Sequence, residues 1–320
     1  MSGSTEEIQA LLVAWEAADD PEPLVIETSG STGQPKRVML SRAAMRASAD
    51  ATHARLGGPG TWELNLPPTY VAGVQVLYRT IRGGGGERRY VSLVPTQLVR
   101  ALRSGERIGQ LSQYDAVLVG GGPLQPMHRT QAERGGIRIV QTYGMSETCG
   151  GCVYDGIPLE GVEIRIDEAD HVLLRGPMLF DGYQGEPERT AEAFRDGWLV
   201  TNDVGHWAED GRLRIDGRVD DMIISGGIKV PAQVVASMIG RDLHGTPVAV
   251  VGVEDPEWGE RVVAVVEVVG QRSAVSLDYL RDLVTPREWA PQRLVFVEKI
   301  PLLPNGKPDR VAIQKLAADA

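Results

Sequence analysis

A stretch rich in glycine and hydroxyl side chains, Thr28 to Lys36, constrains the fold more than any other part of the sequence. It follows the apolar run Leu24-Val25-Ile26, which predicts a strand, and it precedes a helix expected to begin at Ser41. Glycines let backbone N–H groups turn toward an anion, hydroxyl groups add donors, and Lys36 adds a positive charge. The stretch therefore predicts a polyphosphate-binding loop between a strand and a helix.

The loop matches neither of two well-known phosphate-binding motifs. A Walker A loop has glycine immediately before its lysine, and this chain has Pro35 there. The glycine spacing also fails the dinucleotide-binding fingerprint. On these residues alone, a polar Gly/Ser linker is an equal alternative, so the decision rests on other segments.

Four further segments follow the loop in the sequence. They are Gln141–Thr148, Gly197–Asp203, Gly217–Ile223 and Pro304–Lys307, which read Gln-Thr-Tyr-Gly-Met-Ser-Glu-Thr, Gly-Trp-Leu-Val-Thr-Asn-Asp, Gly-Arg-Val-Asp-Asp-Met-Ile and Pro-Asn-Gly-Lys. In this order, the loop and the four segments resemble the motifs of the acyl-adenylate-forming enzymes. That superfamily contains acyl-CoA synthetases, luciferases and peptide-synthetase adenylation domains. The ordered set of matches favours a phosphate loop over a linker.

The resemblance implies an α/β protein of two domains. We expect an N-terminal AMP-binding domain at residues 1–217, with mixed sheets packed with helices plus antiparallel strands. A small α+β C-terminal domain at residues 218–320 is expected to be a mobile lid joined by a hinge. Short apolar runs at residues 62–66, 116–119 and 137–141 independently predict buried strands whose C-terminal ends lead into ligand-facing loops.

Local patterns predict the other elements. Ser4 and Glu7 form a capping box for a helix over residues 4–18, whose core-facing positions are Ile8, Leu11, Leu12 and Trp15. A second helix over residues 41–56 is closed by Gly57. The remaining predicted elements are antiparallel strands between 162 and 215, strands near 248–253, 261–269 and 294–297, a helix at 276–284 and a final helix from Asp309.

Composition and charge exclude several partners. The chain has 33 basic and 43 acidic residues and a net charge of −10, which argues against nucleic acid and anionic membranes because both require basic surface. The longest apolar stretch, around residues 261–269, is too short to cross a bilayer, and the acidic N-terminus lacks an apolar signal core. We expect a cytoplasmic protein without membrane insertion. Its oligomeric state stays open, a homodimer included.

The two cysteines, Cys149 and Cys152, form a Cys-x-x-Cys pair. A zinc site needs a second pair of ligands, which the sequence lacks, and a redox motif needs a strand-to-helix setting. Two cysteines also cannot make a disulfide framework. We therefore expect them to be buried structural residues.

The resemblance implies that the chain joins a carboxylate to the α-phosphorus of ATP and expels pyrophosphate. Such a reaction needs positioned reactants and neutralised phosphate charge more than covalent help. Lys36, Thr32 and the loop amides would hold the β- and γ-phosphates, and Glu147 would hold Mg²⁺, which prefers carboxylate and phosphate oxygens. The other loop residues expected at the nucleotide are Thr28, Ser29, Gly30, Ser31 and Gly33.

The same resemblance assigns the rest of the nucleotide site. Asp203 would accept hydrogen bonds from both ribose hydroxyls, although Asn202 precedes it where relatives have glycine. Arg218 would reach the ribose or the α-phosphate, and the alternative for Arg218 is a surface ion pair with Asp216 or Asp220. The residues expected around the adenine and the phosphates are Gly120, Gly121, Gly122, Tyr143, Gly144 and Ser146.

The C-terminal domain would contribute in two ways. Lys307 lies in a Pro-Asn-Gly-Lys turn and would bridge the carboxylate and the α-phosphate during adenylation only. Rotation about a hinge at Asp220 would then withdraw Lys307 and bring the Gly226-Gly227 loop beside the CoA arm. The Glu-containing segment that follows this loop in relatives is replaced by Pro231-Ala232-Gln233-Val234-Val235, which bears on the thioester step.

Three segments indicate which acid is activated. Leu66–Arg79, Ser92–Leu98 and Gly120–Leu124 look most like the o-succinylbenzoate–CoA ligases of menaquinone biosynthesis. The resemblance implies activation of the succinyl carboxylate by ATP and then formation of the CoA thioester. The alternatives are another short aryl- or acyl-CoA ligase, an adenylating enzyme that does not transfer to CoA, and a non-catalytic nucleotide-binding protein.

Overall fold

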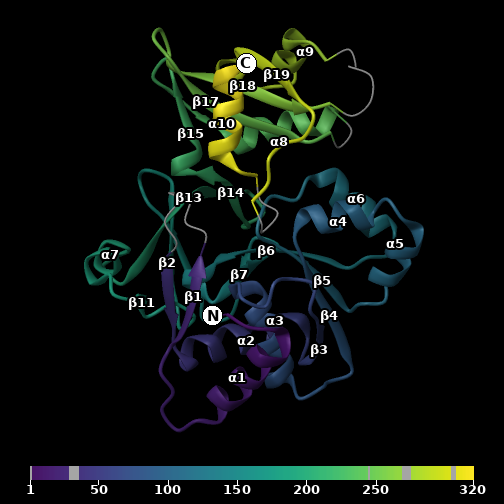
Figure 1. Ribbon diagram of the computed structural model, residues 1–320, viewed down its shortest axis with the longest axis vertical. Helices are drawn as coiled ribbons and strands as arrows, with labels where there is room; N and C mark the ends of the chain where they lie inside the picture. The colour runs from purple at the N-terminus through teal and green to yellow at the C-terminus, as the bar shows by residue number, and fades with distance from the viewer. Residues whose placement is uncertain (1, 29–35, 244–245, 269–274, 304–307) are drawn as a thin grey trace. The chain divides into compact units, whose positions relative to one another are not determined.

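The computed structural model describes residues 2–28, 36–243, 246–268, 275–303 and 308–320 (Figure 1). Several predicted site residues lie outside the described residues: Ser29, Gly30, Ser31, Thr32, Gly33 and Lys307. The chain divides into two compact units. The first unit runs from the N-terminus to Asp167 and also includes Val172–Thr201 and Ala208–Leu213, while the second comprises Glu168–His171, Asn202–Trp207 and Arg214–Ala320. The proposed functional boundary between residues 217 and 218 stays a prediction.

A six-stranded sheet organises the first unit, in the order β3-β4-β5-β6-β7-β8. Its strands are β3 (Gly60–Glu63), β4 (Arg88–Leu93), β5 (Ala116–Val119), β6 (Ile139–Met145), β7 (Gly150–Tyr154) and β8 (Ile157–Pro158). The pairs from β3 to β6 are parallel, whereas β7 runs antiparallel to both neighbours. The carboxyl ends of β3 to β6 therefore lie along one edge, where open α/β sheets bind ligands.

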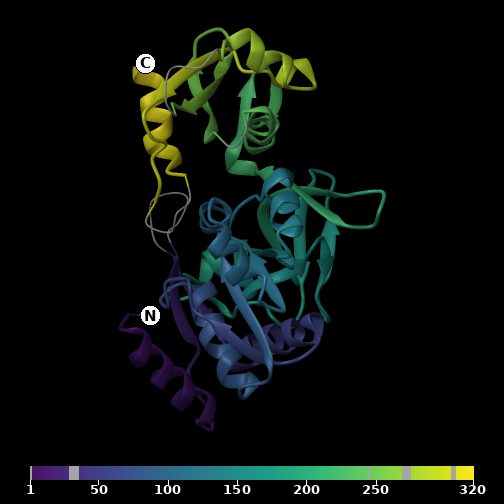
Figure 2. The ribbon, with the colours of Figure 1, turned by 90° about the vertical axis from the view of Figure 1, so that its right-hand side faces the viewer.

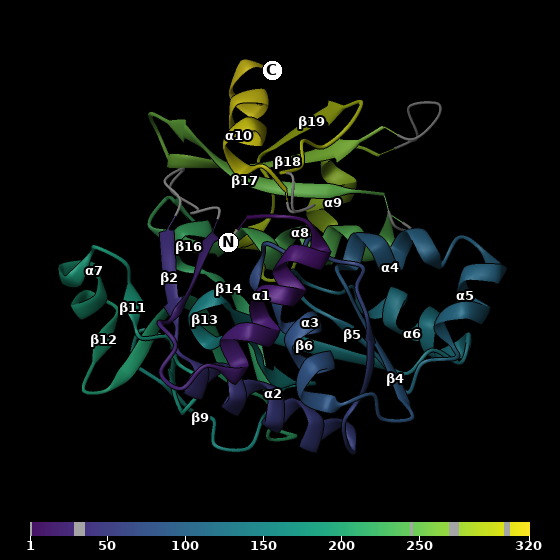
Figure 3. The same cartoon turned by 60° about the horizontal axis from the view of Figure 1, so that its bottom comes forward.

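Helices cover both faces of this sheet (Figure 3). Val91, Leu93, Val117 and Val119 pack in the cluster of α4 (Pro95–Ala101), α5 (Gly105–Leu111) and α6 (Pro126–Arg134). The alternate residues, Tyr90, Ala116 and Leu118, lie in the cluster that includes side chains of α2 (Arg42–Leu56) and α3 (Val71–Gly83). Successive strand residues point to opposite faces, so the short apolar runs fill two cores.

The predicted N-terminal helices are confirmed. Helix α1 (Thr5–Ala17) begins with the Ser4–Glu7 capping box, and α2 begins after Ser41 and ends at Gly57, whose φ is 85°. The expectation for Leu11 was wrong: it is 45% exposed, because Ile8, Leu12 and Trp15 already form the buried stripe and Leu11 lies beside it. Within the described residues, no helix has the length and apolar character that crossing a bilayer would require.

A small antiparallel sheet, β1-β2-β11, joins distant parts of the first unit. It consists of β1 (Leu24–Thr28), β2 (Lys36–Leu40) and β11 (Gly182–Tyr183). The register places Tyr183 opposite Val38. Consequently a residue far along the chain lies next to the strand that starts at Lys36.

The antiparallel strands expected between residues 162 and 215 are present. They form the order β12-β13-β10-β9, with β14 paired to β13, and antiparallel pairing joins β9 to β10 and β12 to β13. The strand bounds are Glu163–Ile166 (β9), His171–Arg175 (β10), Phe194–Arg195 (β12), Trp198–Trp207 (β13) and Leu213–Arg218 (β14), with helix α7 at Pro187–Glu192.

The second unit contains an α+β core (Figure 2). Its sheet order is β16-β15-β18-β17, with β19 parallel to β18. The strands are β15 (Met222–Ser225), β16 (Ile228–Pro231), β17 (Val248–Asp255), β18 (Gly259–Glu267) and β19 (Arg293–Val297), and the helices are α8 (Ala232–Asp242), α9 (Leu277–Asp282) and α10 (Arg310–Asp319). Alternate residues of β18 pack in the α8–α9 cluster and in the α10 cluster, so helices cover both faces. The predicted strands and helices of this region, including the start after Asp309, are confirmed.

Candidate active site

Two residues expected at the phosphates of ATP lie close together in the first unit. Lys36 starts β2, and Glu147 lies in a short 3₁₀ helix, η1 (Ser146–Thr148). The Lys36 Nζ atom is 3.9 Å from Glu147 Oε1. The Tyr183 hydroxyl donates a hydrogen bond of 2.8 Å to the same oxygen, and the Lys36 Nζ atom is 5.2 Å from the centre of the Tyr183 ring. A cation, an anion and a phenol thus meet beside the end of the expected phosphate loop.

The backbone around Glu147 is held from several sides. The buried Thr148 hydroxyl accepts a hydrogen bond from the Met145 N–H and donates one of 2.6 Å to the Gly150 carbonyl. The Phe180 N–H donates to the Glu147 carbonyl at 2.9 Å. Cys149 then turns the chain with a φ of 52°, a conformation that costs free energy in a non-glycine residue. These contacts fix where the Glu147 side chain emerges.

The Glu147 carboxylate suits a Mg²⁺ ion bound together with phosphates. Its side chain is 12% exposed, and among the described residues no donor lies on its second oxygen, Oε2. The described residues also contain no group of three or more His, Cys, Asp or Glu side chains that could hold a metal ion. One carboxylate plus substrate phosphates and water is a common coordination set for Mg²⁺, so Glu147 fits the ion expected from the sequence.

Two of the glycines predicted at the nucleotide, Gly120 and Gly144, have packing reasons of their own. A Cβ atom on Gly120 would lie 2.2 Å from Thr142 Oγ1, and one on Gly144 would lie 2.0 Å from the Gly150 carbonyl oxygen. Gly121 has a φ of 77°, whereas a Cβ atom on Gly122 would make only an ordinary contact, 3.8 Å from Pro95 Cγ. Tyr143 and Gly144 lie on β6, and this strand ends directly before Ser146. Contact of these residues with an adenine stays a prediction.

Asp203 and Arg218 lie on the paired strands β13 and β14. Asp203 is 7% exposed, and its Oδ1 atom is 3.9 Å from Arg218 Nη1. Arg218 also holds Asp220 through two hydrogen bonds of 2.8 and 2.9 Å, and this acidic neighbour raises the pKa of Arg218 above its usual value. Of the two alternatives for Arg218, the pair with Asp220 is therefore the one that forms, while Asp216 lies 2.7 Å from His206 Nδ1.

The Gly226-Gly227 loop is the turn between β15 and β16. Both glycines have positive φ angles, 58° and 81°, which glycine adopts without strain. A Cβ atom on Gly226 would lie 2.8 Å from Cε3 of Trp258, whose carbonyl accepts a hydrogen bond from the Gly226 N–H. At Gly226 both the space and the backbone angle favour glycine, whereas at Gly227 only the backbone angle does. Pro231 ends β16 and directly precedes α8.

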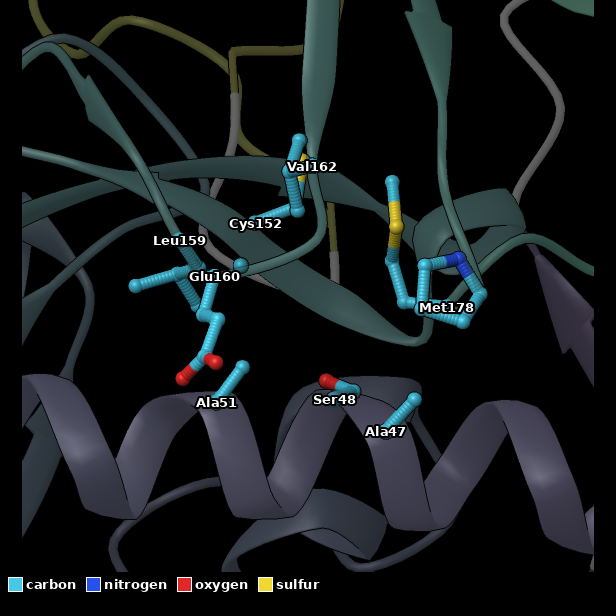
Figure 4. Close-up of a pocket in the computed structure, with 10 residues that line it drawn as sticks. Ala47, Ser48, Ala51, Cys152, Leu159, Glu160, Val162 and Met178 are labelled. Atoms are coloured by element: carbon cyan, nitrogen blue, oxygen red, sulfur yellow. The ribbon is translucent and has the colours of Figure 1, made fainter.

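The cysteines are structural, as the sequence indicated. Both are buried thiols outside any disulfide, and burial raises the pKa of the Cys149 thiol well above its ordinary value. Cys152 lines a cavity of about 10 Å³ between α2 and the segments around β7, together with Ser48 and Met178 (Figure 4). That volume holds about one water molecule, so this cavity is not a substrate site.

Two residues that carried no role in the sequence analysis make notable contacts, namely Tyr183, which lies beside Glu147, and Gln97. The Gln97 Oε1 atom accepts a hydrogen bond from the Val94 N–H at 2.9 Å, and its Nε2 atom donates to the Asn65 carbonyl at 2.8 Å. Gln97 therefore ties the loop after β4 to the loop after β3. Val94 lies in one of the segments that indicated the acid in the sequence, and Asn65 directly precedes another.

Comparison with known proteins gives consistent matches. Residues 245–307 match the family model described as the AMP-binding enzyme C-terminal domain. A probable 2-succinylbenzoate–CoA ligase of Mycobacterium tuberculosis is 38% identical, covering 98% of this chain and 90% of the relative. The 2-succinylbenzoate–CoA ligase of Enterococcus faecalis is 28% identical, covering 88% of this chain and 67% of the relative.

Solved structures agree on the fold. An amide bond synthetase, McbA from Marinactinospora thermotolerans, matches with a TM-score of 0.79 and 30% identity, covering 91% of this chain and 68% of that one. The o-succinylbenzoate CoA synthetase from Bacillus subtilis, in complex with its acyl-adenylate intermediate, has a TM-score of 0.77 and 24% identity, covering 91% and 68%. These matches confirm the expected fold class of a large N-terminal part and a small C-terminal part.

Proposed function

The chain belongs to the family of the 2-succinylbenzoate–CoA ligases, and from this premise we propose that it joins 2-succinylbenzoate to CoA in menaquinone biosynthesis. In the first half-reaction a carboxylate oxygen bonds to the α-phosphorus of ATP and pyrophosphate leaves. In the second, the CoA thiol bonds to the acyl carbon and AMP leaves. The observation that carries the proposal is 38% identity over 98% of the chain.

The first unit would supply most of the charge neutralisation. Lys36 would pair with the β- and γ-phosphates, and Glu147 would hold Mg²⁺, which neutralises phosphate charge when bound with ATP. The loop residues Thr28 to Gly33 would add backbone and hydroxyl donors. Two residues of the second unit would add to this: Asp203 would hold the ribose hydroxyls, and Arg218 would exchange Asp220 for the ribose or the α-phosphate.

The lid domain, residues 218–320, would serve the two half-reactions in turn. Lys307 would stabilise the charge that develops as the carboxylate attacks, and rotation about Asp220 would then present Gly226 and Gly227 to CoA. We place the protein in the cytoplasm, where ATP and CoA are available. A homodimer is the form that we would test first if the protein is not a monomer.

A buried cation suits an acid with a second carboxylate. Arg79 of α3 is 4% exposed, and its Cζ atom lies 5.0 Å from the centre of the Trp62 ring. Among the described residues no carboxylate pairs with Arg79, and its Nε atom is buried without a hydrogen-bond partner. A buried unpaired charge costs several kcal/mol of folding free energy, which an incoming carboxylate would offset. The benzoate carboxylate of 2-succinylbenzoate could supply that partner.

Acid-dependent exchange between ATP and pyrophosphate tests the proposed function. The panel contains 2-succinylbenzoate, 4-oxo-4-phenylbutanoate (which lacks the benzoate carboxylate) and benzoate, each with and without CoA. We expect the exchange rate with 2-succinylbenzoate to exceed the others by about 100-fold, since a missing charged partner costs about 3 kcal/mol. Thioester should form only when CoA is present.

The other outcomes separate the rival functions. Preference for another acid would indicate a different aryl- or acyl-CoA ligase, and absence of exchange with every acid would favour a nucleotide-binding protein. Exchange without any thioester would favour adenylation alone. The altered segment at Pro231–Val235 is the feature that motivates this last alternative.

The two hydrogen bonds by which Gln97 connects the loops give a separate prediction. Gln97→Glu keeps the acceptor for the Val94 N–H but cannot donate to the Asn65 carbonyl, so the two loops should part. Loss of one hydrogen bond of about 1 kcal/mol should raise the KM for the acid about fivefold, with the KM for ATP within about twofold. Gln131→Glu is the matched control, because Gln131 also donates to a carbonyl, that of Leu102, but lies on α6. Equal increases in both KM values would contradict a role specific to the acid.

A further inference from the structure

Tyr183 contacts both residues that we place at the triphosphate. Its hydroxyl donates to Glu147 Oε1 at 2.8 Å, and its ring lies 5.2 Å from Lys36 Nζ. A second cation, Arg189, lies 5.3 Å from the same ring. Lys36 and Glu147 lie close to each other, and one further side chain, that of Tyr183, contacts both of them.

Building on the proposed function, we propose that Tyr183 is a positioning residue that aims the Glu147 carboxylate at the Mg²⁺ ion of bound ATP. A carboxylate has two oxygens, and the phenol hydroxyl occupies one of them. The other oxygen, which has no donor among the described residues, is thereby left for the ion. Outer hydrogen bonds of this kind orient metal ligands and strengthen them.

Tyr183 also limits how closely Lys36 approaches Glu147. The separation of 3.9 Å between Lys36 Nζ and Glu147 Oε1 exceeds the 2.7–2.9 Å of a charge-assisted hydrogen bond. The Tyr183 ring attracts the ammonium electrostatically, and the hydroxyl already occupies one of the two lone-pair sites of Oε1. Without the hydroxyl, Lys36 could pair directly with Glu147, and the carboxylate would then be neutralised before an ion arrives.

The surroundings keep Tyr183 fixed. Its ring packs edge-on against Phe180 at 4.9 Å between centroids, and its N–H donates to Thr190 Oγ1 at 2.9 Å. Gly182 permits this approach, because a Cβ atom there would lie 2.7 Å from Thr190 Cγ2.

Tyr183→Phe tests this inference, since it removes the hydroxyl and keeps the ring beside Lys36 and Arg189. ATP binding is measured by calorimetry in excess Mg²⁺ and in EDTA, and the ratio of the two affinities reports the coupling to the ion. We expect the ratio to fall about tenfold in Tyr183→Phe, the size of effect seen when an outer partner of a metal ligand is lost. In a Glu147→Gln background the same change should have an effect of less than about twofold.

Tyr154→Phe is the matched control. Tyr154 is also buried, and its hydroxyl lies 3.0 Å from Thr52 Oγ1 rather than from a proposed site residue. Its ratio should equal that of the wild type, and thermal unfolding of each variant reports folding separately. An unchanged ratio in Tyr183→Phe, or equal weakening in Mg²⁺ and EDTA, would overturn the positioning role. If the ratio of ATP affinities in Mg²⁺ and EDTA falls in Glu147→Gln but not in Tyr183→Phe, only this inference is contradicted. A wild-type protein that binds no Mg²⁺-ATP would contradict the proposed function as well.

Discussion

Replacing Lys307 by alanine is expected to slow adenylation by at least about 100-fold, the usual cost of removing one preorganised group that stabilises developing charge. Capture of CoA by a pre-formed acyl-adenylate should change by less than about threefold, because Lys307 would be withdrawn from the site during that step. The first rate is measured as pyrophosphate exchange. The second is measured as thioester formation from synthetic adenylate and CoA.

The split between the two rates is what the lid mechanism requires. Lys315→Ala is the control, because Lys315 is an exposed lysine of the same C-terminal region and has no proposed role. Equal slowing of adenylation and CoA capture by Lys307→Ala would contradict the swivelling domain. Unchanged adenylation would remove Lys307 from the site altogether.

Replacing Asp203 by alanine is expected to weaken ATP binding by about 100-fold, since two hydrogen bonds to a charged group contribute about 3 kcal/mol together. Asp203→Asn keeps the shape of the side chain and one acceptor oxygen, so its loss should be smaller. Both are measured by calorimetry with ATP and with 2′-deoxy-ATP. The wild type should prefer ATP by about tenfold, the worth of one such bond, and Asp203→Ala should not discriminate.

The deoxynucleotide separates ribose recognition from damage to the fold. Asp203 is 7% exposed and lies near Arg218, so its removal can disturb the paired strands as well as a ligand. Asp216→Asn is the control, because Asp216 lies on β14 and contacts His206 instead. If Asp203→Ala weakens both nucleotides equally while the wild type does not distinguish them, the assignment to the ribose is wrong.

The elements that the sequence predicted have local causes. The capping box at Ser4, the αL glycine at Gly57 and the Asp309 cap are all determined by residues within one turn. Helix α3 was not predicted. Its residues from Gly73 to Arg79 are all buried, including the polar Gln75 and Arg79, so its polar positions do not mark a face toward water.

The site shows the same division between local and distant causes. Lys36 and Glu147 could be selected because each stands in a recognisable motif. Tyr183 could not, since its role depends on the pairing of a two-residue strand with β2, opposite Val38, and no short-range pattern encodes that pairing. Gln97 is visible as a residue near a helix start, but its bond to the Asn65 carbonyl depends on two loops meeting at the sheet edge.

The ion pair between Arg218 and Asp220 has a consequence for the order of ATP binding and hinge movement. Both side chains are partly exposed to water, 40% and 34%. Exposed ion pairs of this kind contribute about 0–1 kcal/mol to stability, so the pair can break at little cost. Should the guanidinium turn to the nucleotide, the two hydrogen bonds from Arg218 to the aspartate would be lost in the same movement. ATP binding and the loosening of the hinge at Asp220 would then occur together. The domain rotation needed for the second half-reaction would therefore become easier when the first half-reaction begins.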